Sequence, residues 1–249
     1  MSGHSKWHSI RHKKAAVDAK RGKLFTKIIR ELTVAARTGG GSPDVNPRLR
    51  TAIQAGKDVN MPKDTIDKAI RKGTGELPGV SYEDVTYEGY GPGGVAIFIH
   101  GSTDNRNRTS AVIRNILSKH NGNLGEVGCV SWMFAKKGII LVDASAADED
   151  TLTEIAIEAG AEDLVNNGDS FTVTTEPGDL DAVRSALEEK GVKVQSAEIS
   201  MVPNTTVKLE GKDAKHLLKL VGALEEQDDV QSVSANFDIA DEVIEKIGA

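Results

Sequence analysis

The sequence contains little of what disulfide-linked, metal-binding and membrane-spanning proteins require. Cys129 is the single cysteine among 249 residues, which excludes an intramolecular disulfide and a CxxC metal site. No apolar run approaches the roughly 20 residues of a membrane-spanning helix, and no apolar signal segment follows the basic N-terminus. We therefore expect a cytoplasmic protein of a reducing compartment, with no membrane partner.

Residue patterns typical of enzymes are also missing. His4, His8 and His12 recur at the i, i+4 spacing, but no cysteine or carboxylate accompanies them as a further metal ligand. Residues 89–94 (GYGPGG) lack the lysine of a phosphate-binding loop and precede a strand-like run, so they predict a hairpin turn. Cys129 lies in an apolar run, and serine hydrolase signatures are absent. We expect a non-enzymatic protein without metal, cofactor or small-molecule substrate.

What the sequence does have is a separation of charge along the chain. Residues 1–75 contain 17 Lys and Arg and six Asp and Glu, a formal charge of +11, whereas the remaining residues carry −17. A formal net charge of −6 therefore hides a basic head (residues 1–78) on an acidic body (residues 79–249). Such asymmetry indicates nucleic acid as a partner. The alternative is a solvated charged surface, which intermixed signs would favour.

The strongest candidate contacts for nucleic acid lie in the first 30 residues. This segment holds nine Lys and Arg and one acid, Asp18. Trp7 among these cations either stacks on a base or pins the arm to a helix. The predicted contact residues of the segment are Lys6, Trp7, Arg11, Lys13, Lys14, Lys20, Arg21, Lys23, Lys27 and Arg30.

A second candidate anion site lies in the acidic body. Arg106 and Arg108 stand at the start of a predicted helix, where backbone N–H groups favour anions. The alternative is that Asp104 and Asn105 cap this helix while the two arginines pair with nearby acids. We add Arg106 and Arg108 to the predicted nucleic-acid contacts.

Hydrophobic periodicity predicts three helices in the head. The first runs from about Lys20 to the glycines at 39–41, with Leu24, Ile28 and Leu32 on one side. The second begins after Asn46, an N-cap followed by proline. The third begins at Pro62 and ends at Gly73, a glycine stop like the one that ends the first helix. We expect a small three-helix bundle.

The pattern of the body predicts alternating strands and helices. Strand-like runs at 85–90 and 95–100 flank the hairpin turn, and 127–134 predicts a core strand containing Cys129 and Trp132. Residues 138–202 follow the order βαββαβ of ferredoxin-like domains. The tail after residue 204 predicts strand, helix and strand, too little for a domain of its own, so we expect it to complete the unit that begins at 79.

We therefore predict an α+β fold with an N-terminal three-helix bundle and two α/β domains, the third domain inserted into the second. The expected boundaries are 1–78 for the basic arm and helical bundle, 79–134 plus 204–249 for the discontinuous α/β domain, and 135–203 for the inserted ferredoxin-like domain.

Several long motifs, in order, resemble the YebC/PmpR family. They are HSKWHSIRHKK (4–14), NPRLR (46–50), NMPKDTIDKAIRKG (60–73), YEGYGPGG (87–94) and DNRNRT (104–109). The resemblance implies three domains, with ferredoxin-like character in both α/β domains. Members of this family have been described as DNA-binding transcriptional regulators. A second description is of translation factors, including a mitochondrial activator of cytochrome oxidase synthesis and bacterial proteins that act on ribosomes stalled on proline-rich stretches.

Together, the charge pattern and the resemblance lead us to expect a nucleic-acid-binding regulator of gene expression. The leading hypothesis is a DNA-binding transcriptional regulator that acts through the head. The alternative is a translation factor bound to ribosomal RNA or the ribosome, which the lack of a recognisable base-reading helix favours. A protein-binding scaffold ranks below both.

Overall fold

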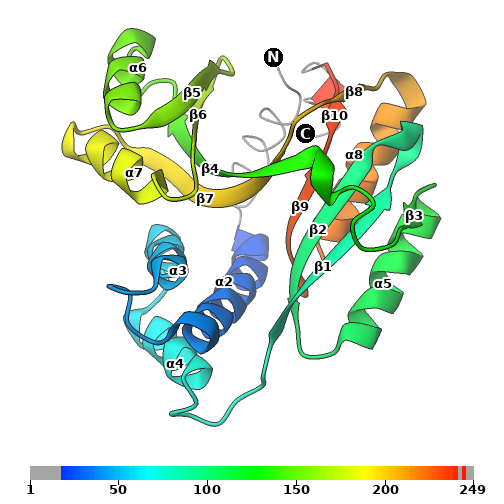
Figure 1. Cartoon of the computed structure of the whole chain (residues 1–249), viewed down its shortest axis with the longest axis horizontal. Helices are drawn as coiled ribbons and strands as arrows, with labels where there is room; N and C mark the ends of the chain where they lie inside the picture. The colour runs from blue at the N-terminus through cyan, green and yellow to red at the C-terminus, as the bar shows by residue number, and fades with distance from the viewer. Residues whose placement is uncertain (1–17, 241–242, 245–249) are drawn as a thin grey trace.

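The head contains three helices that share one apolar core. The computed structural model describes residues 18–240 and 243–244, with side chains from residue 22 onward. The helices are α2 (Asp18–Gly39), α3 (Pro47–Asp58) and α4 (Lys63–Gly73), seen together in Figure 1. Their buried apolar side chains include Ile28, Leu32, Leu49, Ala52, Ile66 and Ala69.

Local interactions explain where these helices begin and end. The side chain of Asn46 accepts the backbone N–H of Leu49 at 3.1 Å, which caps α3 just before Pro47. Gly73 ends α4 against α2: a Cβ at this position would lie 2.4 Å from the carbonyl oxygen of Thr33. The two helices α2 and α4 can therefore approach each other this closely only because residue 73 has no side chain.

The first sheet joins strands from two distant parts of the body. Its order is β3 (Asn123–Leu124), β1 (Glu83–Tyr90), β2 (Ala96–Thr103) and β9 (Val230–Ala235), with every neighbouring pair antiparallel. The predicted hairpin is confirmed, because β1 and β2 pair around the turn η1 (Pro92–Gly94).

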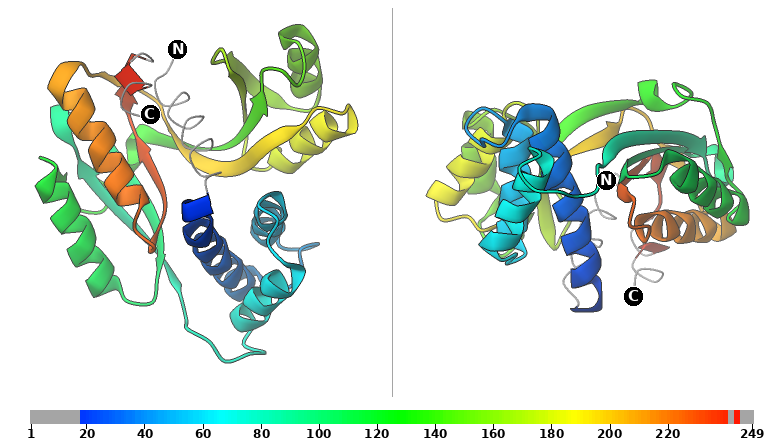
Figure 2. Two further views of the ribbon diagram at one scale, coloured as in Figure 1. Left: turned by 180° about the vertical axis from the view of Figure 1, so that it is seen from behind. Right: turned by 90° about the horizontal axis from the view of Figure 1, so that it is seen from below.

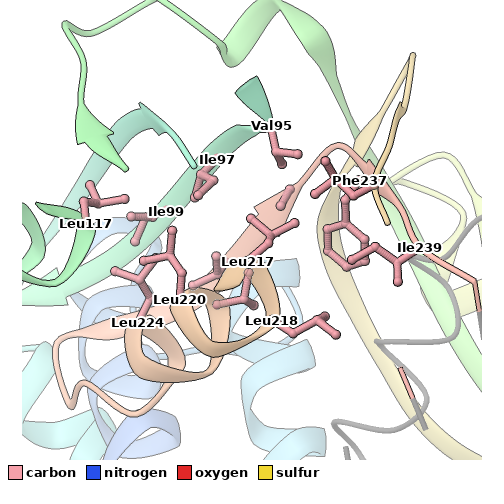
Figure 3. Close-up of a cluster of buried hydrophobic side chains, with 14 of the residues drawn as sticks. Val95, Ile97, Ile99, Leu117, Leu217, Leu218, Leu220, Leu224, Phe237 and Ile239 are labelled. Carbon is pink, nitrogen blue, oxygen red and sulfur yellow. The ribbon is translucent and has the colours of Figure 1, made fainter. Parts of the chain in front are cut away.

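Two helices pack against this sheet, α5 (Arg106–Lys119) and α8 (Gly211–Glu225). Figure 2 shows both on the same face, and Figure 3 shows Leu217 and Leu220 of α8 close to Ile97 of β2. All six buried residues of α8 are apolar, so one side of this helix faces the core and the opposite side faces solvent.

The second sheet lies between residues 134 and 203. It has the order β5 (Ala161–Asn166), β6 (Ser170–Thr175), β4 (Phe134–Asp143) and β7 (Val194–Pro203), with helices α6 (Glu149–Glu158) and α7 (Leu180–Glu189). The chain order of this unit is βαββαβ, as predicted. The unit of the first sheet instead runs ββαβ and later αβ, so it lacks the ferredoxin-like order that the family resemblance implied.

A short parallel pair closes the end of the first unit. β8 (Val207–Lys208) pairs with β10 (Phe237–Asp238), and Phe237 is buried in the core beneath the first sheet. The side chain of Asn236 accepts the backbone N–H of Ala96 at 2.7 Å and ties this end to β2.

The predicted strand at 127–134 is wrong. Before β4 begins, this segment forms a loop with one 3-10 turn, η2 (Ser131–Met133), and the side chain of Trp132 is 69% exposed rather than in the core. The physical cause is Glu88, whose buried carboxylate accepts the backbone N–H groups of Gly128, Val130 and Ser131 at 2.7, 2.7 and 2.8 Å. Those donors are then not available to a neighbouring strand.

Candidate nucleic-acid interface

The predicted contact residues divide into those that the structure describes and those that it does not. Lys6, Trp7, Arg11, Lys13 and Lys14 lie outside the described residues. Lys20 and Arg21 belong to the first turn of α2, but their side chains also lie outside the described set. The structure therefore places five of the predicted side chains, which are Lys23, Lys27, Arg30, Arg106 and Arg108.

The cations of α2 face the body of the same chain. Lys27 Nζ donates to the carbonyl oxygen of Glu225 at 2.7 Å, and Lys23 Nζ to that of Glu226 at 3.4 Å. Arg30 Nη1 donates to the carbonyl oxygen of Asp228 at 2.6 Å. These acceptors belong to the end of α8 and the α8–β9 connection, so one face of α2 is bound to the acidic body.

Asp229 is the centre of this junction. Its carboxylate accepts Arg30 Nη1 at 2.5 Å, Thr109 Oγ1 at 2.6 Å and Arg108 Nη2 at 3.1 Å. Burial raises the pKa of Asp229, but the hydrogen bonds from Thr109, Arg108 and Arg30 outweigh it, so the pKa lies below its usual value. Asp229 is therefore a charged residue that joins α2, α5 and β9.

The start of α5 takes the form of a capped helix with paired arginines. Asn105 caps it by accepting the backbone N–H of Arg108 at 3.0 Å. The guanidinium of Arg108 pairs with Asp104 as well as with Asp229, and Arg106 Nε lies 3.7 Å from a carboxylate oxygen of Glu83. Arg106 remains 65% exposed, so it is the less constrained of the two predicted anion contacts in this region.

Between α2, α5 and the α8–β9 connection lies an open cavity of about 550 Å³. Its lining carries both signs of charge: Lys23, Arg30 and Arg108 face it together with Asp104, Asp228 and Asp229. Because the cations are already matched by acids, the cavity does not present a purely positive surface to a phosphate.

Further ion pairs fix the head to both parts of the body. Arg48 of α3 makes two hydrogen bonds to Glu31 of α2 and two to Asp84 of β1, all between 2.6 and 2.9 Å. Burial raises the pKa of Asp84, but hydrogen bonds from Arg48 and His100 hold it well below its usual range.

The head also contacts the second sheet unit through α3 and α7. Arg50 pairs with Asp181 at 2.8 Å, and the buried Arg184 pairs with Asp58 at 3.2 Å. Part of the opposite charge of head and body is thus neutralised inside the chain.

A cationic face that the sequence reasoning missed lies on α8. Lys212, Lys215, His216 and Lys219 are exposed on the side of this helix opposite its buried residues. Their i, i+3, i+4, i+7 spacing is visible in the sequence and could have revealed them. Within the described part of the chain, none of the four side chains forms a hydrogen bond or an ion pair.

Comparison with known proteins identifies the family. The model of the TACO1/YebC N-terminal domain matches residues 5–76, and that of the TACO1/YebC second and third domain matches residues 82–237. The chain belongs to the TACO1/YebC family.

Its relatives in the TACO1/YebC family match along their whole length. A protein of Desulfosudis oleivorans is 59% identical over 243 residues, 98% of this chain and 99% of the relative. A protein of Trichlorobacter lovleyi is 59% identical over 247 residues, 99% of this chain and 100% of the relative. Both are named "Probable transcriptional regulatory protein".

A solved TACO1/YebC-like structure has the same fold. The crystal structure of a conserved hypothetical protein from Aquifex aeolicus is 50% identical and superposes with a TM-score of 0.85, covering 91% of this chain and 93% of that one. The arrangement of helices and two sheets therefore recurs in a relative.

The described residues of this TACO1/YebC protein include one cysteine, Cys129. They contain no group of three or more His, Cys, Asp or Glu that could hold a metal ion. Burial and the nearby carboxylate of Glu88 raise the pKa of the Cys129 thiol, which disfavours the nucleophilic thiolate. Among the described helices, none is long and apolar enough to cross a membrane.

Proposed function

We propose that this chain is a non-enzymatic, nucleic-acid-binding regulator of gene expression that acts on transcription by binding DNA through its basic head. The observation that carries the proposal is the separation of charge, +11 over residues 1–75 against −17 over the rest. Relatives named as probable transcriptional regulatory proteins support the regulator role. A polyanion is the partner that such a head attracts over a distance.

The contacts proposed for DNA lie chiefly at the N-terminal end. The proposed contacts that precede the part of α2 in contact with the body are Lys6, Trp7, Arg11, Lys13, Lys14, Lys20 and Arg21. Lys23, Lys27, Arg30 and Arg108 already have partners in the body, so each would exchange an intramolecular contact for a phosphate. Their contribution to binding is therefore smaller than that of a free cation, because the lost contact offsets the new one.

We further propose that the chain divides into three domains, 1–78, 79–134 with 204–249, and 135–203. The two sheet orders support this division. Strands from 83–124 and 230–235 share one sheet, whereas the strands between 134 and 203 form the other.

A translation factor that binds ribosomal RNA is the second candidate, and the placement of the head helices favours it. α2 is bound to the α8–β9 connection and α3 to α7. The exposed side of α4 carries Asp64 and Asp67 beside its lysines. Among the described helices of the head, none is both free and uniformly basic, as a helix inserted in a DNA major groove would be. Shape and phosphate contacts to folded RNA need no such helix.

The test is binding of the full-length chain to random-sequence DNA duplexes, a promoter fragment and a folded ribosomal RNA fragment. The variant carries Lys13→Ala, Lys14→Ala, Arg21→Ala and Lys23→Ala. Its control carries Lys119→Ala, Lys136→Ala, Lys190→Ala and Lys193→Ala, four exposed lysines of the body.

We expect the head variant to lose affinity to a similar degree on every DNA sequence and the control to lose little. Wild-type affinity should fall by orders of magnitude between about 50 and 200 mM salt. Equal losses in both variants would contradict the head proposal. Co-sedimentation with ribosomes that RNase abolishes, without sequence-selective DNA binding, would establish the second candidate instead.

A further inference from the structure

The outer face of α8 is a basic surface of the body whose lysines are all unpaired in the described part of the chain. Lys212, Lys215 and Lys219 are exposed, and His216 lies between them on the same side. From Lys212 to Lys219 the helix rises about 10 Å, so the charges follow the helix axis. This length corresponds to about three base pairs of a duplex.

Helix stability does not explain this placement. Lys212 lies in the first turn of α8, where the helix dipole favours acids and disfavours cations. The side chain of the N-cap residue Glu210 makes no capping hydrogen bond, and its carboxylate pairs with Lys208 at 3.5 Å. Asp213 stands at the edge of the face and is exposed without an ion pair to these lysines in the described structure.

The basic face leads toward the head. Glu226 follows Lys219 by seven residues, two helical turns further along the same side of α8, and its carbonyl oxygen accepts Lys23 of α2. Figure 2 shows α8 running along the outside of the first sheet, with α2 in the neighbouring part of the molecule. The C-terminal end of α8 therefore lies beside Lys23 of α2, with the exposed Glu226 between the lysine row and the head.

We infer that the outer face of α8, formed by Lys212, Lys215, His216 and Lys219, is a second contact surface for the phosphate backbone of the nucleic acid that the head binds. The inference rests on the proposed function. The chemistry required is a row of phosphates, which duplex DNA and duplex RNA both provide. Because the lysines are free, phosphate binding here breaks no contact within the protein, unlike binding at Arg30 or Lys27.

The experiment compares two full-length variants with the same change in charge. One carries Lys212→Gln, Lys215→Gln and Lys219→Gln. The control carries Lys136→Gln, Lys190→Gln and Lys193→Gln, three exposed lysines of the second sheet unit. Lys212→Arg, Lys215→Arg and Lys219→Arg together give a third variant that keeps the charge. Affinities for a random-sequence DNA duplex and an RNA duplex are measured over a range of salt concentrations, together with binding to vesicles rich in phosphatidylserine.

We expect the α8 glutamine variant to lose about 100-fold in affinity at about 0.1 M salt, with a salt slope smaller by about 2.7, because three phosphate contacts are lost. The control and the arginine variant should bind as the wild type does. Whether affinity is lost for both duplexes or for one alone shows which phosphate backbone the α8 face binds.

Three outcomes would overturn the inference. The first is an α8 glutamine variant that binds like its control. The second is an arginine variant that loses binding as fully as the glutamine variant, since charge would then not be the cause. The third is a loss of vesicle binding alone, which would assign the face to an anionic lipid surface. If the wild type bound neither duplex, the proposed function itself would fail, so the two failures can be told apart.

Discussion

Arg30 of α2 donates to the carboxylate of Asp229 at 2.5 Å, although the two residues lie 199 positions apart in the sequence. Both side chains are largely buried, with 12% and 14% of their surfaces exposed. The pair connects the basic head to the acidic body at the point where α2, α5 and β9 meet. Charges that the sequence alone predicts to bind an external polyanion are thus partly used to hold the chain together.

Asp229→Asn should destabilise the protein more than any neutralisation of a neighbouring exposed acid. Removing one partner of a buried ion pair leaves Arg30 without its charge partner and costs about 3 kcal/mol. The free energy of unfolding in urea measures the effect. The control is Asp228→Asn in the same connection, whose exposed side chain forms no ion pair within the described structure and should cost less than about 0.5 kcal/mol. Similar losses in both variants would rule out the role given to Asp229.

Stability should fall as the pH is lowered below about 5. The pKa values of Asp84, Glu88 and Asp229 lie below the ordinary values of 3.8 for Asp and 4.5 for Glu. The unfolded chain therefore binds protons before the folded chain does, and the stability that these carboxylates provide above their ordinary pKa is lost as the pH falls. Thermal unfolding midpoints between pH 7 and 3 measure this loss.

The matching control for the acid effect is the double variant Asp84→Asn and Asp229→Asn. It should be less stable at neutral pH and should lose less stability than the wild type on acidification. An unchanged slope of stability against pH would show that other carboxylates are responsible.

Glu88→Ala should release the loop that precedes β4. The substitution leaves the backbone N–H groups of Gly128, Val130 and Ser131 without their acceptor, at a cost of about 3 kcal/mol or more. Hydrogen exchange of these amides should accelerate, and the emission of Trp132 in a Trp7→Phe background should change. Glu126→Ala removes an exposed carboxylate from the same loop and should alter neither. Slow exchange of these three amides in the Glu88 variant would contradict the prediction.

Gly73→Ala should destabilise the head by about 1 to 3 kcal/mol. The added Cβ would lie 2.4 Å from the carbonyl oxygen of Thr33 and 2.8 Å from the Cβ of Ala36, so α4 must move away from α2. Gly22→Ala is the control in α2, because a Cβ there meets no atom within 4 Å and should stabilise the helix by up to about 1 kcal/mol. Urea unfolding followed by circular dichroism distinguishes the two.

Elements with strong periodic patterns could be predicted from the sequence, and contacts between distant segments could not. Leu24, Ile28 and Leu32 repeat at helical spacing, so α2 could be predicted without knowledge of its neighbours. The direction in which Lys23 and Lys27 point could not be predicted, because they donate to the backbone carbonyl oxygens of Glu226 and Glu225, and every residue has such a carbonyl whatever its type.

The error at 127–134 has a similar origin. An apolar run that includes Val130 and Trp132 predicts a strand, but one buried carboxylate on β1 takes the backbone donors of the loop. The basic face of α8 is a different case, since its spacing is visible in the sequence and only its lack of ion pairs required the structure.

The pairing of β2 with β9 determines the order in which the protein can fold during synthesis. β9 ends at residue 235, so the first sheet lacks its edge strand and its helix α8 until almost the whole chain has been made. The four strands between 134 and 203 are complete some 30 residues earlier and can form a sheet while β2 still lacks β9 on one of its edges. A chain that is released early therefore leaves the edge of β2 and the apolar side chains beneath it uncovered, which is the state in which new proteins aggregate or engage chaperones.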